Sequence, residues 1–437
     1  MRKNFFKKVL AVTLASTMAF SMVGCGNSDS KSEGKKDDGT ITLNVWHQWS
    51  NDTNELKGRY EEAVKAYEKD NPNVKIKTET LDTEAYKTKI NAEFAGDAKG
   101  IDVFYWWGAG TAKKLVDAGK VMALDDYVTD DVKSKILEGS TSAFEFDGKL
   151  YSVPMFSWYM TLFCNKTMFD KAGATLPTTY DELVDAVKKL KKLDGVTPMA
   201  AGAKDGWNAA FVYQALALRE VGATGVNEML SGKKEFGDEG FKKAAQKVSD
   251  LYEMGAFGDN PLEQGNDDAN AAFENGKAAM RLMGSWFANN VYTDDAATIK
   301  PEEVVALKIP TIADGKGEAT DYCGGFVESF WVNNNTKYKE EAAKFCIYIN
   351  EKMGVASYET GSGFSGWTTK ADESKLNPLF IQIKDLLAEG KQGVLAWDTS
   401  LEAEPAAVHN EQVQTLFADG ADIDAFIDEH KAAINGK

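Results

Sequence analysis

The sequence predicts an α/β fold built on a parallel sheet, and three features indicate it. Residues 41–105 alternate short apolar strands with helical patterns in the order β-α-β-α-β. Further along, residues 278–283 form a strand directly after an Asn275-Gly276 break that ends a helix. The 437 residues are enough for two or three domains. Strands that alternate with helices pack as a parallel sheet with helices on its faces.

The first elements follow from the spacing of apolar residues. The expected strands are residues 41–46, 74–80 and 101–105. Asn51 or Thr53 caps the helix between the first two strands, and a second helix covers residues 86–94. Because parallel strands end at the same edge, the turns WHQWSND, LDT and WWGAG meet there, where doubly wound folds bind ligands.

The middle of the chain continues the pattern of strands and helices. Asp147-Gly148 is a turn before a strand at residues 149–154. Thr179 and Glu182 have the spacing of a capping box, and Leu183 begins the buried stripe of the helix that follows. The next expected helices cover residues 207–221 and 241–254, and a third runs from Asp267 or Asp268 to Phe273.

The segment FENGKAAMRLMGSW, residues 273–286, is central to the interpretation of the chain. The Asn-Gly step supplies the positive-φ positions that a sharp reversal needs. The apolar run after it is too short for a helix, so it predicts a strand that ends at Gly284-Ser285 and delivers Trp286. A residue just past a strand end lies where α/β sheets place ligands. The competing interpretation is a Trp in the core.

The last third of the chain has strands, a glycine-rich loop and terminal helices. The expected strands are residues 302–309 and 321–335, and helices are expected at residues 340–350, 405–417 and 422–434. Residues 311–320 are a polar loop, and residues 361–367, GSGFSGW, are rich in glycine. No internal repeat is evident.

The first 39 residues are read as targeting and tether. MRKNFFKK is basic, an apolar stretch too short to span a bilayer follows, and then comes Met22-Val23-Gly24-Cys25. This resembles a bacterial lipoprotein signal, residues 1–25, in which Cys25 is lipidated; Met22 stands where Leu is usual. A plain secretory peptide is the alternative. Residues 26–39 have no apolar side chain that could pack and form a flexible tether.

Composition excludes several classes of partner. Hydrophobic residues make up 43% and charged residues 27%, as in ordinary globular proteins. The net charge of -17 repels nucleic acid and anionic membrane surfaces, so neither is expected as a partner. Cys164, Cys323 and Cys346 lie in apolar contexts and are expected as small buried side chains. With three His and no metal-ligand spacing, no metal and no cofactor is expected.

Two phrases resemble the sugar-binding family of extracellular solute-binding proteins of ABC importers. One is the segment ending in GSW at residues 284–286. The other matches at Asn165, Lys166, Phe169, Lys171, Ala172, Gly173, Pro177, Thr179, Asp181, Glu182 and Leu183. Cys164 and Tyr180 stand where the family usually has Tyr and Trp.

The resemblance covers the mature chain and implies a two-lobe, periplasmic-binding-protein-like fold with hinge crossovers and a ligand cleft between the lobes. The N-terminal lobe is expected at residues 40–154 plus 321–357, and the C-terminal lobe at residues 155–320 plus 358–437. The crossovers are expected near residues 152–158, 310–322 and 354–366.

A sugar cleft needs aromatic faces for the C–H side of the rings and polar groups for the hydroxyls. Strand ends and motif positions select the candidate ligand contacts: Gln48, Trp49, Asp82, Trp106, Trp107, Trp158, Trp286, Gly324, Gly325, Trp367, Trp397 and Asp398. The two glycines are expected to let backbone amides approach the ligand. Each Trp has a core position as its alternative, Asp82 has a helix-capping role, and His47 is expected to be structural.

The resemblance implies a monomeric binding lipoprotein, not an enzyme, held at the outer face of the cell membrane by Cys25. It would close on an extracellular carbohydrate, expected to be an oligosaccharide, and deliver it to the permease subunits of an ABC transporter. The acidic balance leaves a cationic ligand such as a polyamine as one alternative. A secreted glycoside hydrolase is the other, since 67 acidic residues always offer a carboxylate pair.

Overall fold

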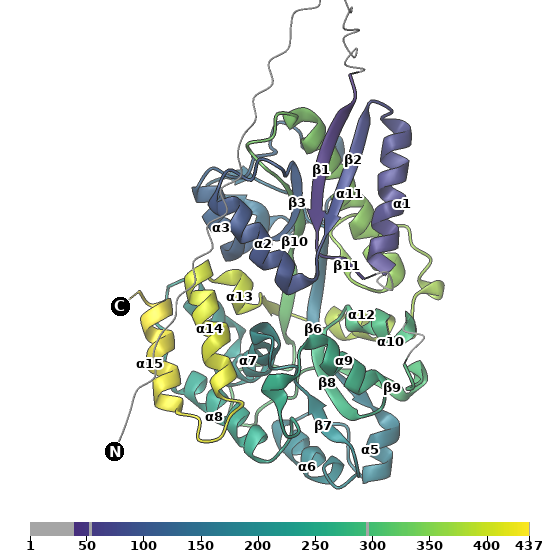
Figure 1. Ribbon diagram of the computed structural model, residues 1–437. Helices are drawn as coiled ribbons and strands as arrows, with labels where there is room; N and C mark the ends of the chain where they lie inside the picture. Colours follow the sequence, from purple (N-terminus) through teal and green to yellow (C-terminus); the bar gives the residue numbers. More distant parts are fainter. Residues whose placement is uncertain (1–38, 52–54, 294–296, 437) are drawn as a thin grey trace, which may run out of the picture. The chain divides into compact units, whose positions relative to one another are not determined.

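Three parallel strands with connecting helices form the first part of the structure, as the sequence predicts (Figure 1). They are β1 (Ile41–His47), β2 (Val74–Thr80) and β3 (Val103–Trp107), in the order β2-β1-β3. The connecting helices are α1 (Glu55–Asp70) and α2 (Thr83–Ala95). The ends of β1 and β3 therefore lie at one edge, next to the start of α2.

The computed structural model describes residues 39–51, 55–293 and 297–436. The expected signal peptide, Cys25, the tether up to residue 38 and the possible cap Thr53 lie outside the described residues. Residues 40–437 form one compact unit. Among the described residues, no helix is both long and apolar enough to cross a membrane.

Helices cover both faces of this part of the sheet. Helix α1 packs against α11 (Lys339–Thr360) on one side, while α2 and α3 (Ala109–Asp117) lie on the other (Figure 1). Helix α11 extends ten residues beyond the expected end at residue 350, and α3 was not expected at all. The sequence does not indicate α3 clearly because Gly110, a poor helix former, lies in its first turn.

A second group of strands continues the sheet in the order β6-β8-β7. These are β6 (Phe156–Asn165), β8 (Ala278–Gly284) and β7 (Thr197–Ala200). Strand β9 (Val304–Leu307) also pairs with β6 and is shorter than the expected strand at 302–309. The sharp break before β8 is confirmed, with Gly276 at a φ of 63°.

The other α-helices of the described residues lie between and after these strands. They are α4 (Asp130–Lys133), α5 (Lys166–Ala172), α6 (Tyr180–Leu190), α7 (Gly206–Leu230), α8 (Glu239–Glu253), α9 (Asn266–Glu274), α10 (Phe287–Thr293), α12 (Pro378–Ala388), α13 (Trp397–Ser400), α14 (Ala403–Thr415) and α15 (Ile423–Ile434). The capping box of Thr179 and Glu182 at the start of α6 is confirmed. Helix α7 continues past the expected end through a kink at Gly222.

Short strands complete the sheet and one hairpin. Strands β4 (Glu145–Phe146) and β5 (Lys149–Leu150) pair across the predicted Asp147-Gly148 turn. The expected strand at residues 149–154 is thus two residues long. Strand β11 (Phe364–Ser365), inside the glycine-rich loop, pairs with β6, and β12 (Gln392–Val394) pairs with β10.

Strand β10 (Asp321–Val332) joins the two groups of strands. Its first half pairs with β6, and its second half pairs with β3, both antiparallel. The register shifts between Phe326 and Glu328, where one pairing gives way to the other. The first half of β10 can lie close to β6 because residue 324 is a glycine. A Cβ on Gly324 would lie 2.1 Å from the carbonyl oxygen of Trp158.

Two buried clusters correspond to the two lobes of the fold. One includes β1, β3, α11 and Phe156, and the other includes β8, α7, α8 and Trp158. On β6 the boundary between the two clusters therefore lies between Phe156 and Trp158, within the crossover expected at 152–158. On β10 it falls between Cys323 and Phe330, just after the crossover expected at 310–322. Cys164, Cys323 and Cys346 are free and buried, as predicted.

Replacement of Gly324 tests how tightly the two crossing strands approach. We expect Gly324→Ala to lower the free energy of unfolding by about 2 kcal/mol or more, because a side chain meets the Trp158 backbone at a φ of 135°. Gly58→Ala is the control. Gly58 lies in α1 with nothing near its missing Cβ, so this change should raise the free energy of unfolding by about 0.5–1 kcal/mol. Urea unfolding measures both, and equal effects would contradict the close approach.

Candidate functional site

One wall of the candidate site forms where β3 ends. Trp107 is the last residue of β3 and is half-buried against the first cluster. Glu328 on β10 is its register partner, so the carboxyl and the indole lie side by side. From α2, one turn after its start, the ammonium of Lys87 lies 5.1 Å from the Trp107 ring centre. This wall combines an indole face, a buried carboxyl and an ammonium group.

The opposite wall belongs to the second cluster and presents two more indoles. Trp207 lies in the first turn of α7, and Trp286 follows β8, as the GSW motif predicts. Both are half-buried, and their ring centres are 6.4 Å apart. Trp286 also packs edge-on against the buried Trp158 at 5.1 Å. Lys87 connects the walls, since its ammonium lies 6.0 Å from the Trp207 ring centre.

The first residue of the GSW motif, Gly284, has to lack a side chain. The Trp286 ring folds back over it, so that a Cβ on Gly284 would lie 2.0 Å from a ring carbon. Any side chain at position 284 would push the indole out of this orientation. The motif therefore fixes the direction of Trp286 as well as its position.

Buried hydrogen bonds hold the elements of this wall. The Arg281 guanidinium on β8 is buried and donates to the Asn208 side chain at 2.8 Å and to the carbonyls of Ala200 and Ala201. It also donates to Asn266 Oδ1 at 3.1 Å. These bonds tie β7 and α9 to the start of α7, which carries Trp207.

Asp398 reaches the site from α13, which a buried histidine pair secures. Gln214 accepts from the Trp397 backbone N–H at 3.4 Å and contacts His409 Nε2 at 3.0 Å. His409 Nδ1 then contacts His430 Nε2 at 2.9 Å. Burial lowers the pKa of His430 to about 4, so the pair is neutral at physiological pH. This network joins α7, α13, α14 and α15.

The two lobes also touch directly beside Asp398. The Thr111 hydroxyl on α3 donates to the carbonyls of Asp398 and Thr399, each at 3.3 Å. Gly110 makes this possible, because a Cβ there would lie 2.2 Å from the Ser400 carbonyl oxygen. The WWGAG segment, expected at the ligand edge, thus provides a contact between lobes as well as Trp107.

Burial dominates the electrostatics of the carboxyl groups. It raises the pKa of Glu328 to about 7, against the smaller opposing effects of the neighbouring Tyr105 and Trp107 side chains and of the Lys87 charge. Burial also raises the pKa of Asp398, and Lys87 opposes that rise. Both carboxyls are thus held in a poorly hydrated space, where they bind hydrogen-bond donors strongly.

Gln48, directly after β1, contributes an unpaired polar atom. The side-chain oxygen of Gln48 is buried and has no hydrogen-bond partner among the described residues. His47 is buried, and its Nδ1 accepts from the Trp49 backbone N–H at 3.2 Å, which agrees with the structural role expected for it. Burial lowers the pKa of His47 to about 3. The unpaired oxygen keeps Gln48 as a candidate ligand contact.

Nine of the twelve predicted contacts fall into two groups. Gln48, Trp107, Trp286 and Asp398 are half-buried and lie on segments that border the site. Trp49, Trp106, Trp158, Trp367 and Trp397 are buried in the two clusters. Trp158 lies directly behind Trp286, whereas the Trp367 indole donates to the Pro154 carbonyl at 2.6 Å, away from the indole pair. Ligand contact by the buried group stays a prediction.

Three predicted residues have clear structural tasks. Asp82 is exposed and caps α2, accepting from the Ala85 backbone N–H at 3.2 Å. Gly324 and Gly325 admit the Trp158 backbone and the Leu395 side chain, respectively. The structure thus gives both glycines a packing role, against β6 and Leu395, and approach of their backbone amides to a ligand stays a prediction.

Sequence reasoning missed Lys87, Trp207 and Glu328. Trp207 follows Asp205-Gly206 at a helix start, a position comparable to the other strand-end and loop Trp residues, so it could have been added. Glu328 is an acidic residue in the middle of a largely apolar strand, which is itself a signal of function. Lys87 carries no such signal, because its neighbours on α2 include several exposed charges.

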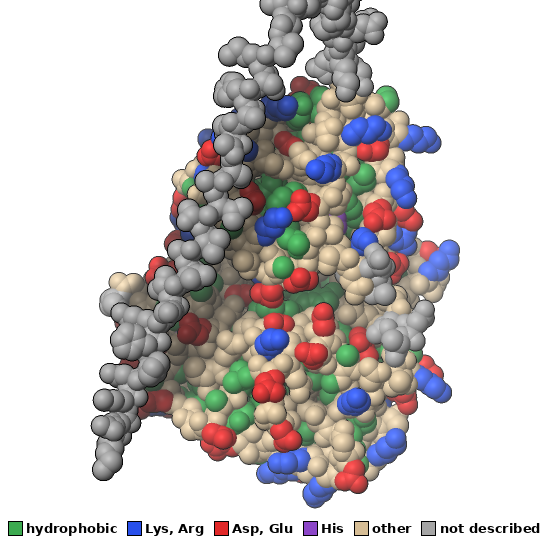
Figure 2. Space-filling view, viewed as in Figure 1, with side chains coloured by type: hydrophobic (Ala, Val, Ile, Leu, Met, Phe, Trp, Pro, Cys, Tyr) green, Lys and Arg blue, Asp and Glu red, His purple; other side chains and the backbone are tan. Residues whose placement is uncertain are grey.

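The space-filling view supports a site between the lobes. Figure 2 shows a hollow across the middle of this face, with acidic side chains near its edges and hydrophobic side chains within it. In addition, no group of His, Cys, Asp and Glu suited to a metal ion occurs in the described ranges.

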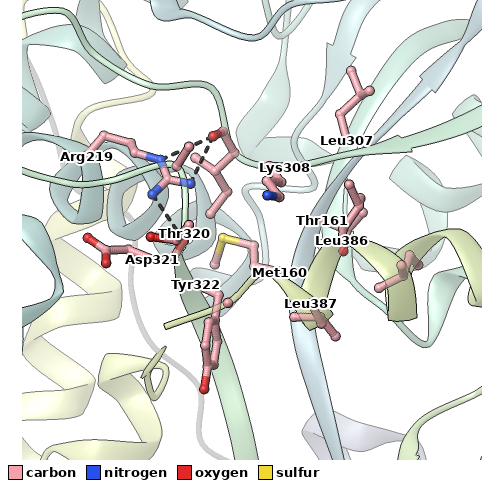
Figure 3. A pocket seen from close by; sticks show the side chains of 14 residues that line it. Met160, Thr161, Arg219, Leu307, Lys308, Thr320, Asp321, Tyr322, Leu386 and Leu387 are labelled. Carbon is pink, nitrogen blue, oxygen red and sulfur yellow. Dashed lines mark hydrogen bonds between the residues drawn. The ribbon is translucent and has the colours of Figure 1, made fainter. Parts of the chain in front are cut away.

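Two cavities lie elsewhere, beside α7. The first is lined by Met160, Tyr322 and Leu387 and by Arg219, which donates to the Ile309 carbonyl at 3.0 Å (Figure 3). Its volume of about 30 Å³ has room for about two water molecules and none for a sugar ring. The second, about 320 Å³, is an open charged depression near the Gly222 kink. Neither includes a predicted contact.

Comparisons with known proteins concern the family and the fold of the chain. The family model described as bacterial extracellular solute-binding protein matches residues 51–355. A solved structure from a study of xylan utilization by the thermophilic bacterium Caldanaerobius polysaccharolyticus is 36% identical; the match covers 90% of this chain and 100% of that one, with a TM-score of 0.86.

Two sequence relatives are more distant. An uncharacterized ABC transporter extracellular-binding protein of Pyrococcus horikoshii is 26% identical over 354 residues, 77% of each chain. A multiple sugar-binding protein of Streptococcus mutans is 23% identical over 391 residues, 86% of each chain.

The buried carboxyl of Glu328 is expected to make the stability of the protein depend on pH. The pKa of Glu328 rises from 4.5 to about 7 on folding. Ionisation of Glu328 therefore does not lower the free energy of unfolding below pH 4.5, lowers it increasingly between pH 4.5 and pH 7, and has its full effect above pH 7. At 1.36 kcal/mol per pKa unit this is about 3 kcal/mol. We therefore expect Glu328→Gln to be more stable than the wild type at pH 8 by up to that amount, with a smaller advantage at pH 5.

Urea unfolding at both pH values measures this difference. Glu429→Gln, on the exposed face of α15, is the control and should give the same small effect at pH 5 and pH 8. A Glu328→Gln effect that does not change with pH would contradict the buried, protonated carboxyl.

Proposed function

Since the chain belongs to the family of bacterial extracellular solute-binding proteins, we propose that it captures an extracellular oligosaccharide and delivers it to an ABC permease. Family members are solute receptors, not enzymes, and they act outside the cytoplasm as binding components of ABC importers. The ligand would enter between the lobes and favour their closed arrangement through contacts with both.

The observation that carries the proposal is the set of half-buried indoles on both walls of the site. Trp107 lies on one lobe, and Trp207 and Trp286 lie on the other. Indole faces suit the apolar C–H faces of sugar rings. Gln48, Glu328 and Asp398 would accept hydrogen bonds from the hydroxyls, which cannot be buried without partners.

An oligosaccharide fits better than a single sugar. The ring centres of Trp207 and Trp286 are 6.4 Å apart, and Trp107 faces them through Lys87 rather than by direct contact. Several stacking surfaces at separate places suit a chain of rings. The relative studied for xylan utilization, at 36% identity, supports a xylan-derived oligosaccharide as the first ligand to test.

We further propose a lipid anchor at Cys25 and a tether of residues 26–39. The basic start, short apolar stretch and cysteine carry this part of the proposal. An anchored monomer beside its permease would release sugar at the membrane surface. Metabolic labelling with a palmitate analogue tests it, since a Cys25→Ala variant should lose the label.

Removal of the Trp286 indole tests the sugar site. A ligand at about 100 times its dissociation constant stabilises the wild type by about 2.7 kcal/mol. In a thermal-shift screen of xylo-, manno- and chito-oligosaccharides, we expect Trp286→Ala to lose the shift while the unliganded variant still unfolds in one cooperative transition. Trp286 is only partly buried, at the edge of its cluster, so its loss lowers the unliganded melting temperature without unfolding the protein.

Two further variants sharpen this test. Trp286→Phe keeps an aromatic face and should retain part of the shift, while Gly284→Ala should weaken binding by displacing the indole. A binding protein also returns the saccharide unchanged, so shortened products would indicate a hydrolase instead. A folded Trp286→Ala variant with an undiminished shift would refute the role of this residue.

A further inference from the structure

Lys87 occupies an unusual place between the lobes. It extends from α2 of the first lobe, and its ammonium lies 5.1 Å from the Trp107 ring centre and 6.0 Å from the Trp207 ring centre. These indoles belong to opposite walls. Both distances are within the range of cation–π attraction, which extends to about 6 Å.

One carboxylate is paired with the same ammonium, and two further carboxyl groups lie within range of its charge. Glu84 Oε1, one helical turn earlier, lies 3.0 Å from the Lys87 nitrogen. The charge of Lys87 also acts on the carboxyls of Glu328 and Asp398, one from each side of the site. Acidic groups from both lobes thus converge on a single lysine.

Indole faces combined with carboxylates are the arrangement that proteins use to bind organic ammonium groups. In this chain the arrangement is already filled by the side chain of Lys87. We infer that Lys87 is a specificity-determining residue: its ammonium occupies the cation position of the cleft, so the receptor rejects cationic ligands and accepts uncharged saccharides. The inference rests on the proposed function of the same cleft.

The charges explain both halves of this selectivity. A polyamine would have to displace Lys87 from the indoles and carboxylates, and the displaced ammonium would repel it. A saccharide carrying a carboxylate would meet the acidic groups of both lobes. A neutral saccharide avoids both costs, because Lys87 already offsets part of the acidic charge.

Removal of this charge should convert the specificity. Lys87→Met keeps most of the aliphatic stem and leaves the indoles and carboxylates without their ammonium. Isothermal titration calorimetry with spermidine and with xylotetraose, at low and high salt, compares this variant with the wild type. Lys87→Arg retains the charge.

Lys89→Met is the matched control. Lys89 also lies on α2, with its ammonium 2.6 Å from Glu79 and 4.6 Å from the Trp46 ring centre, but all three residues belong to the first lobe. Its loss removes the same kinds of interaction without opening a position between the lobes.

We expect Lys87→Met to bind spermidine at least tenfold more tightly than the wild type, and to lose this gain in high salt. The wild type, Lys87→Arg and Lys89→Met should show no comparable spermidine binding. Tight spermidine binding by the wild type, or none by a folded Lys87→Met variant, would overturn the inference. Failure of the wild type to bind any saccharide would instead count against the proposed function, because the spermidine comparison needs no sugar.

Discussion

The antiparallel pairing of β6 with β10 is the constraint on which the rest of the structure depends. These two strands pass from one buried core to the other, and each carries a residue of the site or its support, Glu328 and Trp158. Gly324 allows the two backbones to meet closely, and the register shift before Glu328 turns β10 toward β3. This joint of two paired strands connects the lobes, and in the proposed function it is the place about which they would close.

This joint determines how the walls of the site face each other. Glu328 emerges beside Trp107 because β10 pairs with β3 just after the crossing. Trp286 faces back toward the same region because β8 pairs with β6, and Gly284 leaves room for the indole to fold. Lys87 then spans the space between Trp107 and Trp207. Indoles, carboxyls and one ammonium meet through long-range pairing of strands.

Local patterns in the sequence predicted the local parts of this structure. The β1-α1-β2-α2-β3 order, the Asn275-Gly276 break, the capping box at Thr179 and the delivery of Trp286 after a strand all depend on neighbouring residues, and each is confirmed. Burial of a given Trp depends on packing between distant segments, so Trp367 and Trp397 looked like Trp107 in the sequence. The role of Lys87 arises from contacts between α2 and α7, about 120 residues apart, which no local pattern records.

The central claim is that a saccharide is held between two lobes that move about the β6–β10 joint. Small-angle X-ray scattering of the mature protein with and without saturating saccharide, using the oligosaccharide that gives the largest thermal shift, measures this motion directly. The account predicts a smaller radius of gyration when the sugar is bound, because contacts with both walls favour closure. Superimposable scattering curves from the free and saturated protein would contradict it.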